Sequence, residues 1–272
     1  MKLVPIQAYG AVGVFDSGVG GLTVLRHIRH ALPREHLIYV ADSGHAPYGD
    51  KSAHYIAQRS LAIAYFLAQQ GAIAIVIACN TASAAAAARL RSCFNQPIIA
   101  MEPAIKPSIA VTRSGVVGIL ATMGTLESSR FAALLERYTG SIEVVTQGCP
   151  GLMEQVEQGD LYSAKSRLLI ERYTAPLLAC GADTLVLGCT HYPFLSPLIT
   201  DVVGEKIPLI ETGAAVARQL QRRLLESAPG RFHHSQASTQ FWTSGDVQIA
   251  NHIFPKLWGE YLTVKNLPPE FM

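Results

Sequence analysis

The sequence contains little charge and no cluster of charge of one sign. Only 15% of its 272 residues are Asp, Glu, Lys or Arg, the formal net charge at pH 7 is +2, and no run of five basic residues occurs. Nucleic-acid-binding proteins carry a basic patch or stripe, so we expect no nucleic acid partner. No stretch reaches the roughly 18 apolar residues that a membrane span requires, so we expect no membrane partner.

The start of the chain lacks the features of a secretory signal. It reads MKLVPIQAYG, with one lysine, a proline and a glycine that interrupt the apolar stretch, and no small-residue cleavage site. We therefore expect a cytoplasmic protein, in which thiols stay reduced.

Cysteine is scarce, and its five copies include no Cys-x-x-Cys pair. An odd number without this spacing argues against a disulfide framework and a structural zinc site. A metal site built from Cys79, Cys189 and His191 lacks a fourth ligand at ordinary spacing, so we expect no metal. Free cysteines usually pack in the interior, and we predict that role for Cys93, Cys149 and Cys180.

Common nucleotide and hydrolase motifs are also missing. The glycine-rich segment Gly13–Gly21 is followed by Thr23, not glycine, at the third position of a dinucleotide fingerprint. There is no Gly-Lys-Ser/Thr and no Gly-x-Ser-x-Gly. The sequence therefore does not match the nicotinamide-binding fingerprint, and nothing indicates a serine hydrolase.

What the sequence does contain is a regular alternation of apolar runs with segments of helical period. The runs have the continuous apolar character of strands buried on both faces. They are Ala11–Phe15, Leu37–Ala41, Ile73–Ala78, Val116–Leu120, Ile142–Val145 and Thr184–Gly188. The clearest helices are Ser52–Gln70, Thr81–Cys93 and Gly213–Glu226. This alternation predicts an α/β fold with mainly parallel sheets flanked by helices.

Two pairs of segments indicate an internal repeat. GVFDSGVGG from Gly13 is similar to GILATMGT from Gly118, and IVIACNTAS around Cys79 is similar to LVLGCTHYP around Cys189. Any two α/β halves share apolar strands that end in small polar residues, but a cysteine in the same place twice favours duplication. We predict two similar lobes, residues 1–100 plus 213–272 and residues 101–212.

Both repeated cysteines follow a predicted strand, where open α/β sheets bind ligands. Cys79 precedes a helix that Asn80 or Thr81 would cap, and Thr190 would cap a helix after Cys189. A helix N-terminus favours the thiolate, so we expect thiol pKa values below the usual value of about 8.5. His191 can exchange a proton with a nearby thiol, although packing cysteines and a structural histidine are the simpler alternatives.

Two polar loops also follow strands. Asp16 can hold an ammonium group or, more simply, cap a helix, while the glycines around it expose amides to an anion. The segment Pro47–Gly49 can present backbone amides to a carboxylate or form an ordinary surface turn.

Taken together, these motifs resemble those of glutamate racemases. They are D-S-G-V-G-G at Asp16–Gly21, P-Y-G at Pro47–Gly49, C-N-T-A-S at Cys79–Ser83, A-T-x-G-T at Ala121–Thr125 and G-C-T-H-Y-P at Gly188–Pro193. With FWTSGD at Phe241–Asp246, the resemblance covers nearly the whole chain. CNTAS or GCTHYP alone would indicate only the wider aspartate/glutamate racemase superfamily.

The resemblance implies two pseudo-symmetric lobes with the active site in the cleft between them, and neither a cofactor nor a metal. It implies that Cys79 takes the α-proton of D-glutamate and Cys189 that of L-glutamate, with Asp16 and His191 assisting. Glu157 of QVEQG would also line the site, although Glu154 lies three residues away. The product D-glutamate would serve peptidoglycan synthesis.

Substrate binding would fall to small polar residues and backbone amides, which hold carboxylates without adding charge beside the thiols. These candidates are Asp16, Ser17, Pro47, Tyr48, Gly49, Asn80, Thr81, Thr122, Thr125 and Thr190. Dimerisation is common in the family, so a homodimer is a further expectation. The alternatives are a related racemase or dicarboxylate isomerase, and a non-catalytic binding protein for an acidic amino acid.

Overall fold

The computed structural model describes residues 10–138, 140, 142–227 and 237–272. Residues 1–9, which carry the expectation that no secretory signal is present, lie outside the described residues. Within the described part of the chain, no helix is both long and apolar enough to cross a membrane.

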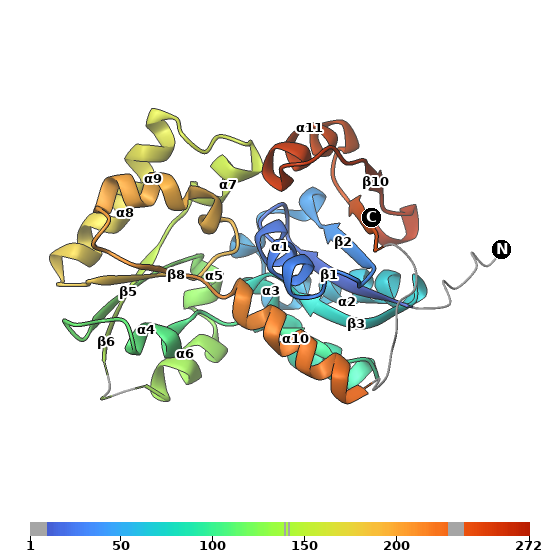
Figure 1. The fold of residues 1–272 in the computed structure, drawn as a ribbon, viewed down its shortest axis with the longest axis horizontal. Coiled ribbons are helices and arrows are strands. Elements are labelled where there is room, and N and C mark those ends of the chain that lie inside the picture. The colour runs from blue at the N-terminus through green and yellow to red at the C-terminus, as the bar shows by residue number, and fades with distance from the viewer. Residues whose placement is uncertain (1–9, 139, 141, 228–236) are drawn as a thin grey trace.

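Two separate parallel sheets divide the molecule into two lobes (Figure 1). The first sheet has the strand order β10-β9-β2-β1-β3-β4, and the second has the order β6-β5-β7-β8. The strands of the first are β1 (Ala11–Asp16), β2 (Leu37–Ala41), β3 (Ala72–Ile77), β4 (Ile98–Ala100), β9 (Thr239–Thr243) and β10 (Val264–Asn266). Those of the second are β5 (Val116–Ala121), β6 (Glu143–Gly148), β7 (Thr184–Leu187) and β8 (Leu209–Ile210). Every neighbouring pair is parallel, which confirms the predicted α/β class.

The second sheet repeats the strand order of the first. In the first lobe β1 lies between β2 and β3, with β4 beyond β3; in the second, β5 lies between β6 and β7, with β8 beyond β7. Cys79 follows β3 and Cys189 follows β7, so the two cysteines occupy equivalent positions. This is the pseudo-symmetry that the repeated motifs predict.

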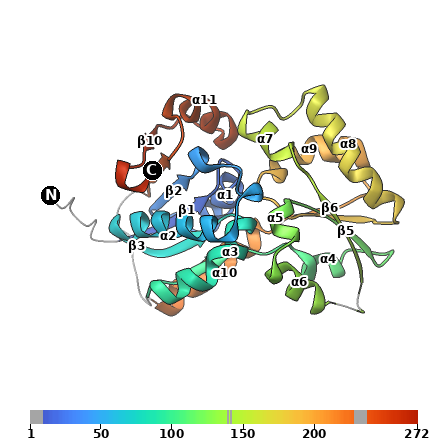
Figure 2. The same ribbon diagram turned by 180° about the vertical axis from the view of Figure 1, so that it is seen from behind.

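Helices cover both faces of each sheet (Figures 1 and 2). The longer ones are α1 (Leu22–Ala31), α2 (Ala53–Gln69), α3 (Asn80–Cys93), α6 (Ser129–Glu136), α8 (Ala164–Ala179), α9 (Ser196–Val203), α10 (Gly213–Ser227) and α11 (Val247–Trp258). Shorter ones are α4 (Ile105–Ile109), α5 (Met123–Leu126), α7 (Leu152–Glu157), η1 (Ser43–His45), η2 (Tyr48–Asp50), η3 (Tyr192–Leu195) and η4 (Pro269–Phe271). The three predicted helices are confirmed as α2, α3 and α10 to within one residue at each end.

Side chains that alternate along β1 build two cores. Val12 and Val14 belong to the core that includes α1 and α10, whereas Ala11 and Phe15 belong to the core beneath α2 and α3. This alternation is the period of two that a strand imposes. It explains why the strand reads as a continuous apolar run, since both of its faces are covered.

The prediction that Ile142–Val145 forms a strand buried on both faces is wrong in one respect. The strand β6 is present, but each of its residues is partly or fully exposed. Because β6 lies at the edge of the second sheet, its apolar residues Val144 and Val145 are only partly covered.

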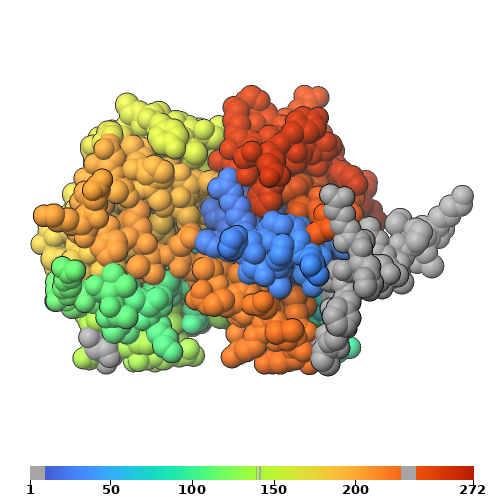
Figure 3. Space-filling model, viewed as in Figure 1, coloured from blue at the N-terminus to red at the C-terminus, as the bar shows by residue number. Residues whose placement is uncertain are grey.

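The second lobe is inserted into the first. The chain leaves the first sheet after β4 and returns only with α10, which packs against α1, and with β9 and β10. On the face in Figure 3 the side chains of the two lobes are in contact, and one apolar core includes residues of both. The domain limits at residues 100/101 and 212/213 stay a prediction with which the strand membership agrees.

Candidate active site

A cavity with an empty volume of about 270 Å³ lies where β1, β3, β5 and β7 end. Both lobes contribute to its wall, and the two repeated cysteines face it. The lining residues are Ser17, Tyr48, Gly49, Cys79, Asn80, Thr81, Thr122, Met153, Gly188, Cys189, Thr190 and His191. The location agrees with the rule that open α/β sheets bind ligands beyond the carboxyl ends of their strands.

Cys79 is itself the N-cap of α3. Its Sγ accepts a hydrogen bond from the amide of Ala82 at 3.4 Å. The prediction that Asn80 or Thr81 caps this helix is therefore wrong, because both residues already lie inside its first turn. The Cys79 thiol also lies 3.7 Å from the hydroxyl of Ser17 and donates to it.

The expected fall in the pKa of Cys79 is also wrong. Burial and the nearby charge of Asp16 raise the pKa of the Cys79 thiol well above its ordinary value. The hydrogen bonds from Ala82 and with Ser17 lower it, but by less. The helix terminus is present as predicted, whereas the desolvation that outweighs it is visible only in the folded protein.

Asp16 is fully buried at the end of β1. Its Oδ1 accepts hydrogen bonds from the Ser17 amide at 2.7 Å and the Ser17 hydroxyl at 3.3 Å. Its Oδ2 accepts from the amide of Gly21, the N-cap residue of α1, at 2.6 Å, and from the hydroxyl of Thr190 at 3.2 Å. Burial raises the pKa of this carboxyl, an effect that nearby His191 offsets only in part. Asp16 thus connects to both the Cys79 side and the start of α1.

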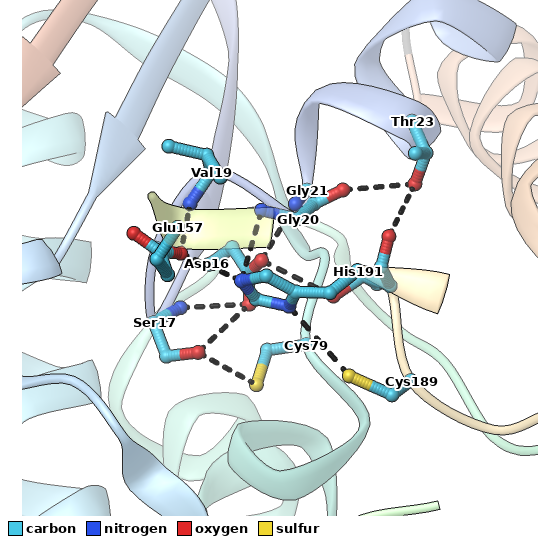
Figure 4. A network of polar contacts seen from close by, with 12 residues as sticks. Asp16, Ser17, Val19, Gly20, Gly21, Thr23, Cys79, Glu157, Cys189 and His191 are labelled. Carbon is cyan, nitrogen blue, oxygen red and sulfur yellow. Dashed lines mark hydrogen bonds and ion pairs between the residues drawn. The ribbon is translucent and has the colours of Figure 1, made fainter. Parts of the chain in front are cut away.

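Cys189, His191 and Glu157 form a second connected group (Figure 4). The Cys189 Sγ lies 3.6 Å from His191 Nδ1, and His191 Nε2 lies 2.6 Å from Glu157 Oε1. Burial lowers the pKa of His191, but its interactions with Cys189 and Glu157 raise it by more, so it lies well above its ordinary value. A protonated imidazole can donate to the sulfur and to the carboxylate at once.

The local structure after Cys189 differs from the prediction. No helix capped by Thr190 begins there: a 3₁₀ turn starts at Tyr192, and α9 starts only at Ser196. The Thr190 hydroxyl instead donates to Asp16, across the boundary between the lobes. Pro193 does occupy an early position of the 3₁₀ turn.

Glu157, not Glu154, enters the polar network around His191. Its Oε1 also accepts the amide of Val19 at 2.7 Å, a contact from the second lobe to the first. Glu154 lies in the wall of a neighbouring cavity of about 340 Å³ empty volume, together with Pro47 and Asp50.

The glycines of the D-S-G-V-G-G loop have a steric explanation. A Cβ at Gly18 would lie 1.8 Å from Glu157 Oε1, and a Cβ at Gly20 would lie 2.2 Å from His191 Nδ1. Neither distance is compatible with a side chain, so the close approach of Glu157 and His191 to the loop requires glycine.

Asn80 is a polar residue of the cavity wall. The residue is buried and lines the cavity, yet neither its side-chain oxygen nor its nitrogen has a hydrogen-bond partner within the described chain. Buried polar atoms are normally paired. A bound molecule with polar groups would satisfy both.

Three of the predicted substrate-binding residues do not line the cavity. Asp16 lies behind Ser17, and Pro47 lines the neighbouring cavity. Thr125 is buried behind Thr81 and Thr122, whose hydroxyl oxygens lie 3.2 and 3.0 Å from its own. These three residues therefore adjoin the cavity only through their neighbours.

Tyr48 is not part of a surface turn. It is 1% exposed, and its hydroxyl donates to Asp42. Two further lining residues, Met153 and Gly188, are not among the predicted site residues. Gly188 precedes Cys189 within G-C-T-H-Y-P and was detectable there, but no sequence signal marks Met153.

The other cysteines divide into two kinds. Cys149 is buried, as predicted for a packing residue, and burial raises its pKa to about 12. Cys93 and Cys180 are exposed, so the packing prediction is wrong for both. They lie at the ends of α3 and α8, where the chain leaves the core. Within the described ranges, no three His, Cys, Asp or Glu side chains are placed to hold a metal ion.

The arrangement can move protons on two sides of one small ligand. Each lobe supplies a cysteine, and each cysteine has its own acid/base neighbour, Ser17 with Asp16 on one side and His191 with Glu157 on the other. Such a pair can remove a proton from one face of a carbon atom and return one to the opposite face.

Comparison with known proteins gives a consistent result. The family model for Asp/Glu/hydantoin racemases matches residues 12–220. The chain is 57% identical over 259 residues to a glutamate racemase from Ectopseudomonas mendocina, covering 95% of this chain and 98% of that protein. It is 54% identical over 262 residues to a glutamate racemase from Methylococcus capsulatus, covering 96% of each chain.

Solved structures of similar proteins share the fold. A glutamate racemase isoform from Bacillus anthracis superposes with a TM-score of 0.87 at 32% identity, covering 96% of this chain and 98% of that one. The Escherichia coli glutamate racemase, solved with L-glutamate and the activator UDP-MurNAc-Ala, gives 0.85 at 34% identity, covering 95% and 98%. The Francisella tularensis enzyme, solved with D-glutamate, gives 0.83 at 27% identity, covering 96% and 98%.

Proposed function

The chain belongs to the Asp/Glu/hydantoin racemase family and within it to the glutamate racemases, which are isomerases, and from this premise we propose that Cys79 and Cys189 are its two catalytic bases. One observation carries the proposal: two buried cysteines, at equivalent strand ends of two pseudo-symmetric lobes, face the same small cavity. Inversion of a carbon atom requires one base on each of its faces.

In the D-to-L direction, the Cys79 thiolate removes the α-proton of D-glutamate. The C–H electron pair stays on the α-carbon and is delocalised into the α-carboxylate. The Cys189 thiol then donates its proton to the opposite face, and the new C–H bond gives L-glutamate. In the L-to-D direction the two thiols exchange roles, so each enantiomer has its own base.

On the Cys79 side, Ser17 and Asp16 connect the sulfur to a proton acceptor. The Cys79 thiol donates to the Ser17 hydroxyl, which donates to Asp16 Oδ1. Burial raises the pKa of the Asp16 carboxyl, which makes this group a better proton acceptor. The ammonium group of a bound amino acid would add a positive charge beside Cys79 and lower the thiol pKa that burial raises.

On the Cys189 side, His191 is the proton partner. Its imidazolium stabilises the Cys189 thiolate, and the carboxylate of Glu157 stabilises the imidazolium. We propose Asp16, His191 and Glu157 as residues that assist the two cysteines.

Substrate binding is proposed for the polar residues that line the cavity: Ser17, Tyr48, Gly49, Asn80, Thr81, Thr122 and Thr190. Asn80 has two unpaired polar atoms for a carboxylate or an ammonium group. Pro47 and Thr125 are proposed to support Gly49 and Thr122, and Asp16 to position Ser17. We further propose that the enzyme works in the cytoplasm without a cofactor and supplies D-glutamate for peptidoglycan.

The first test is racemisation by the purified protein without added cofactor. We expect circular dichroism to show interconversion of both enantiomers, and we expect deuterium from solvent to enter the α position of each. Absence of exchange with either enantiomer would rule out the proposal, and faster reaction with aspartate would indicate a related racemase instead.

The second test separates the two bases. Cys79→Ser should lose interconversion but retain slow α-deuterium exchange of L-glutamate, whereas Cys189→Ser should retain it only for D-glutamate. The exposed cysteines provide matched controls, since Cys93→Ser and Cys180→Ser should behave as wild type. Full activity in both catalytic variants would favour a non-catalytic role for the thiols. Homodimer formation stays a prediction, checked by analytical ultracentrifugation.

A further inference from the structure

Asp42 is a fully buried carboxylate that the mechanism above does not use. It follows β2, at the start of the turn that leads through η1 to η2. A buried charge destabilises the fold unless it is paired and hydrogen-bonded. The hydrogen-bond partners of Asp42 therefore indicate its role.

Two side chains hold the Asp42 carboxylate. The Arg59 guanidinium binds it with both edges of its fork, Nη2 at 2.7 Å from Oδ1 and Nε at 3.0 Å from Oδ2. The Tyr48 hydroxyl donates to Oδ2 at 2.6 Å. A bidentate arginine–carboxylate pair fixes orientation as well as distance, so Asp42 holds the hydroxyl end of Tyr48 in one place.

Arg59 is fixed in turn by a third segment. Its Nη2 donates to the carbonyl of Phe271 at 2.9 Å, and its Nη1 donates to the main-chain oxygen of Met272 at 3.0 Å. The Phe271 ring packs on Phe66, which lies on the same helix as Arg59. One guanidinium thus joins α2, the turn after β2 and the chain around η4.

The main chain of Asp42 contacts the opposite part of the site. Its amide donates to the carbonyl of Asp16 at 2.9 Å. Asp42 is therefore bonded to Asp16, beside Ser17, through its backbone, and to Tyr48 through its side chain. Ser17 and Tyr48 both line the cavity, whereas Asp42 and Arg59 do not.

The turn that Tyr48 begins is packed tightly on the second lobe. A Cβ at Gly49 would lie 3.3 Å from Thr122 Cβ, and a Cβ at Gly124 would lie 3.0 Å from the Gly49 carbonyl oxygen. Since Gly49 and Thr122 both line the cavity, a small displacement of the turn changes the width of the cavity and the contact between the lobes.

We propose that Asp42 and Arg59 are positioning residues that hold the Tyr48–Gly49 wall of the cavity in place and thereby set the affinity for glutamate, an inference that rests on the proposed function. Neither residue lines the cavity. Their effect reaches it through the Tyr48 hydroxyl and through the Asp16 carbonyl.

The experiment measures KM and kcat in both directions for four variants. Tyr48→Phe removes only the hydroxyl, Asp42→Asn removes the charge, Arg59→Lys keeps the charge without the fork, and Arg59→Gln removes both. Circular dichroism and the urea unfolding midpoint verify that each variant is folded under assay conditions.

We expect KM to rise for both enantiomers while kcat changes by less than about threefold. The rise should be about fivefold for Tyr48→Phe, as for the loss of one hydrogen bond, and about tenfold or more for Asp42→Asn. Arg59→Lys should lie between wild type and Arg59→Gln. The KM of the double variant Asp42→Asn/Arg59→Gln should be no higher than that of the single variant with the higher KM, because both changes break the same pair.

A purely structural role predicts a different pattern, with a lower unfolding midpoint and an unchanged KM in the folded fraction. That pattern in Tyr48→Phe and Asp42→Asn would overturn the proposal, and if Asp42→Asn fails to fold, Tyr48→Phe decides alone. The control Arg167→Gln breaks an exposed ion pair with Asp201 in the second lobe and should leave KM and kcat unchanged. A wild-type protein that does not interconvert glutamate would overturn the proposed function and this inference with it.

Discussion

His191 lies between the two lobes and contacts residues of both. One ring nitrogen faces the sulfur of Cys189, the other faces Glu157, and the amide nitrogen of Gly20 lies 3.3 Å from Nε2. The ring is 1% exposed. A protonated imidazole in such a place is stable only while its acceptors are present.

Glu157→Gln tests this dependence. The raised pKa of His191 stabilises the fold fully below its ordinary pKa of about 6.5, and this contribution is lost as pH rises through the raised value. Without the carboxylate the His191 pKa should fall, because Glu157 is one of the groups that raise it. We expect Glu157→Gln to cost about 2 kcal/mol of unfolding free energy near pH 6 and less at pH 9, measured by urea denaturation and by NMR titration of the imidazole.

Glu154→Gln is the matched control, since Glu154 lies one turn away outside the His191 network. It should leave both the His191 pKa and the stability unchanged. An unaltered imidazole titration in Glu157→Gln would contradict the assigned pairing.

At the scale of single residues, the sequence predicts which residues form the site better than it predicts the surroundings of each. Cys79, Cys189 and His191 are identifiable because they follow strand ends in repeated motifs. The direction of the Cys79 pKa shift cannot be predicted from the sequence. It depends on burial beside Asp16, and these two residues are 63 positions apart in the chain. The pairing of Asp42 with Arg59 is not predictable for the same reason, because no motif spacing marks these two charged residues.

Among the elements, α3 has an unusual beginning, since its N-cap residue is the proposed base Cys79. The Cys79 side chain therefore caps the helix and is also a proposed base. Serine caps helices well and alanine does not, which provides a way to separate the two roles.

We expect Cys79→Ser to keep the stability of the wild type to within about 1 kcal/mol, and Cys79→Ala to lose about 1 kcal/mol, from the known cost of removing a cap. Both should lose racemisation. Ser163→Ala removes the cap of α8 in the second lobe and should lose similar stability while retaining activity. If Cys79→Ser proves less stable than Cys79→Ala, the Cys79 thiol does not act as a cap.

Helices and strands with a long sequence pattern are predicted correctly. Those whose length or exposure depends on neighbouring elements are not. The helices α2 and α10 and the strand β2 follow from composition and period alone. The strands β8 and β10 span two and three residues and carry no usable signal. The exposure of β6 depends on its edge position, which strand sequence does not encode.

At the scale of the whole molecule, several polar contacts cross between the lobes around the cavity. Val19 donates its amide to Glu157, Thr190 donates its hydroxyl to Asp16, and the hydroxyls of Thr81 and Thr122 lie 2.9 Å apart. A ligand that touches both lobes adds to these contacts, so binding should stabilise this closed arrangement.

Hydrogen–deuterium exchange of the Ser17–Gly21 segment tests this expectation. The Val19 amide loses its acceptor when the lobes separate, so saturating D-glutamate should slow its exchange and Glu157→Ala should accelerate it. Amides of β1, which pair within the first sheet, should be unaffected. Equal protection of the Ser17–Gly21 segment with and without ligand would contradict closure by the substrate.

The repeated motifs predict the two lobes and the cleft, but not how the first sheet is completed. The strands β9 and β10 pair beside β2 although more than 190 residues of chain separate β9 from it. The motif F-W-T-S-G-D marks β9 as a family segment but does not reveal its neighbour, because strand pairing over such a distance is set by the assembled fold.

The insertion of the second lobe gives the chain a definite order of completion on the ribosome. When residue 227 has been made, all strands of the second sheet exist, whereas the first sheet still lacks β9 and β10. Until they arrive, β2 is an uncovered edge with free backbone groups, and Arg59 lacks the main-chain oxygens of Phe271 and Met272 that hold it. The first lobe is thus completed after the second, and the Tyr48–Gly49 wall of the cavity gains the support of Arg59 only once the segment around η4 has been made.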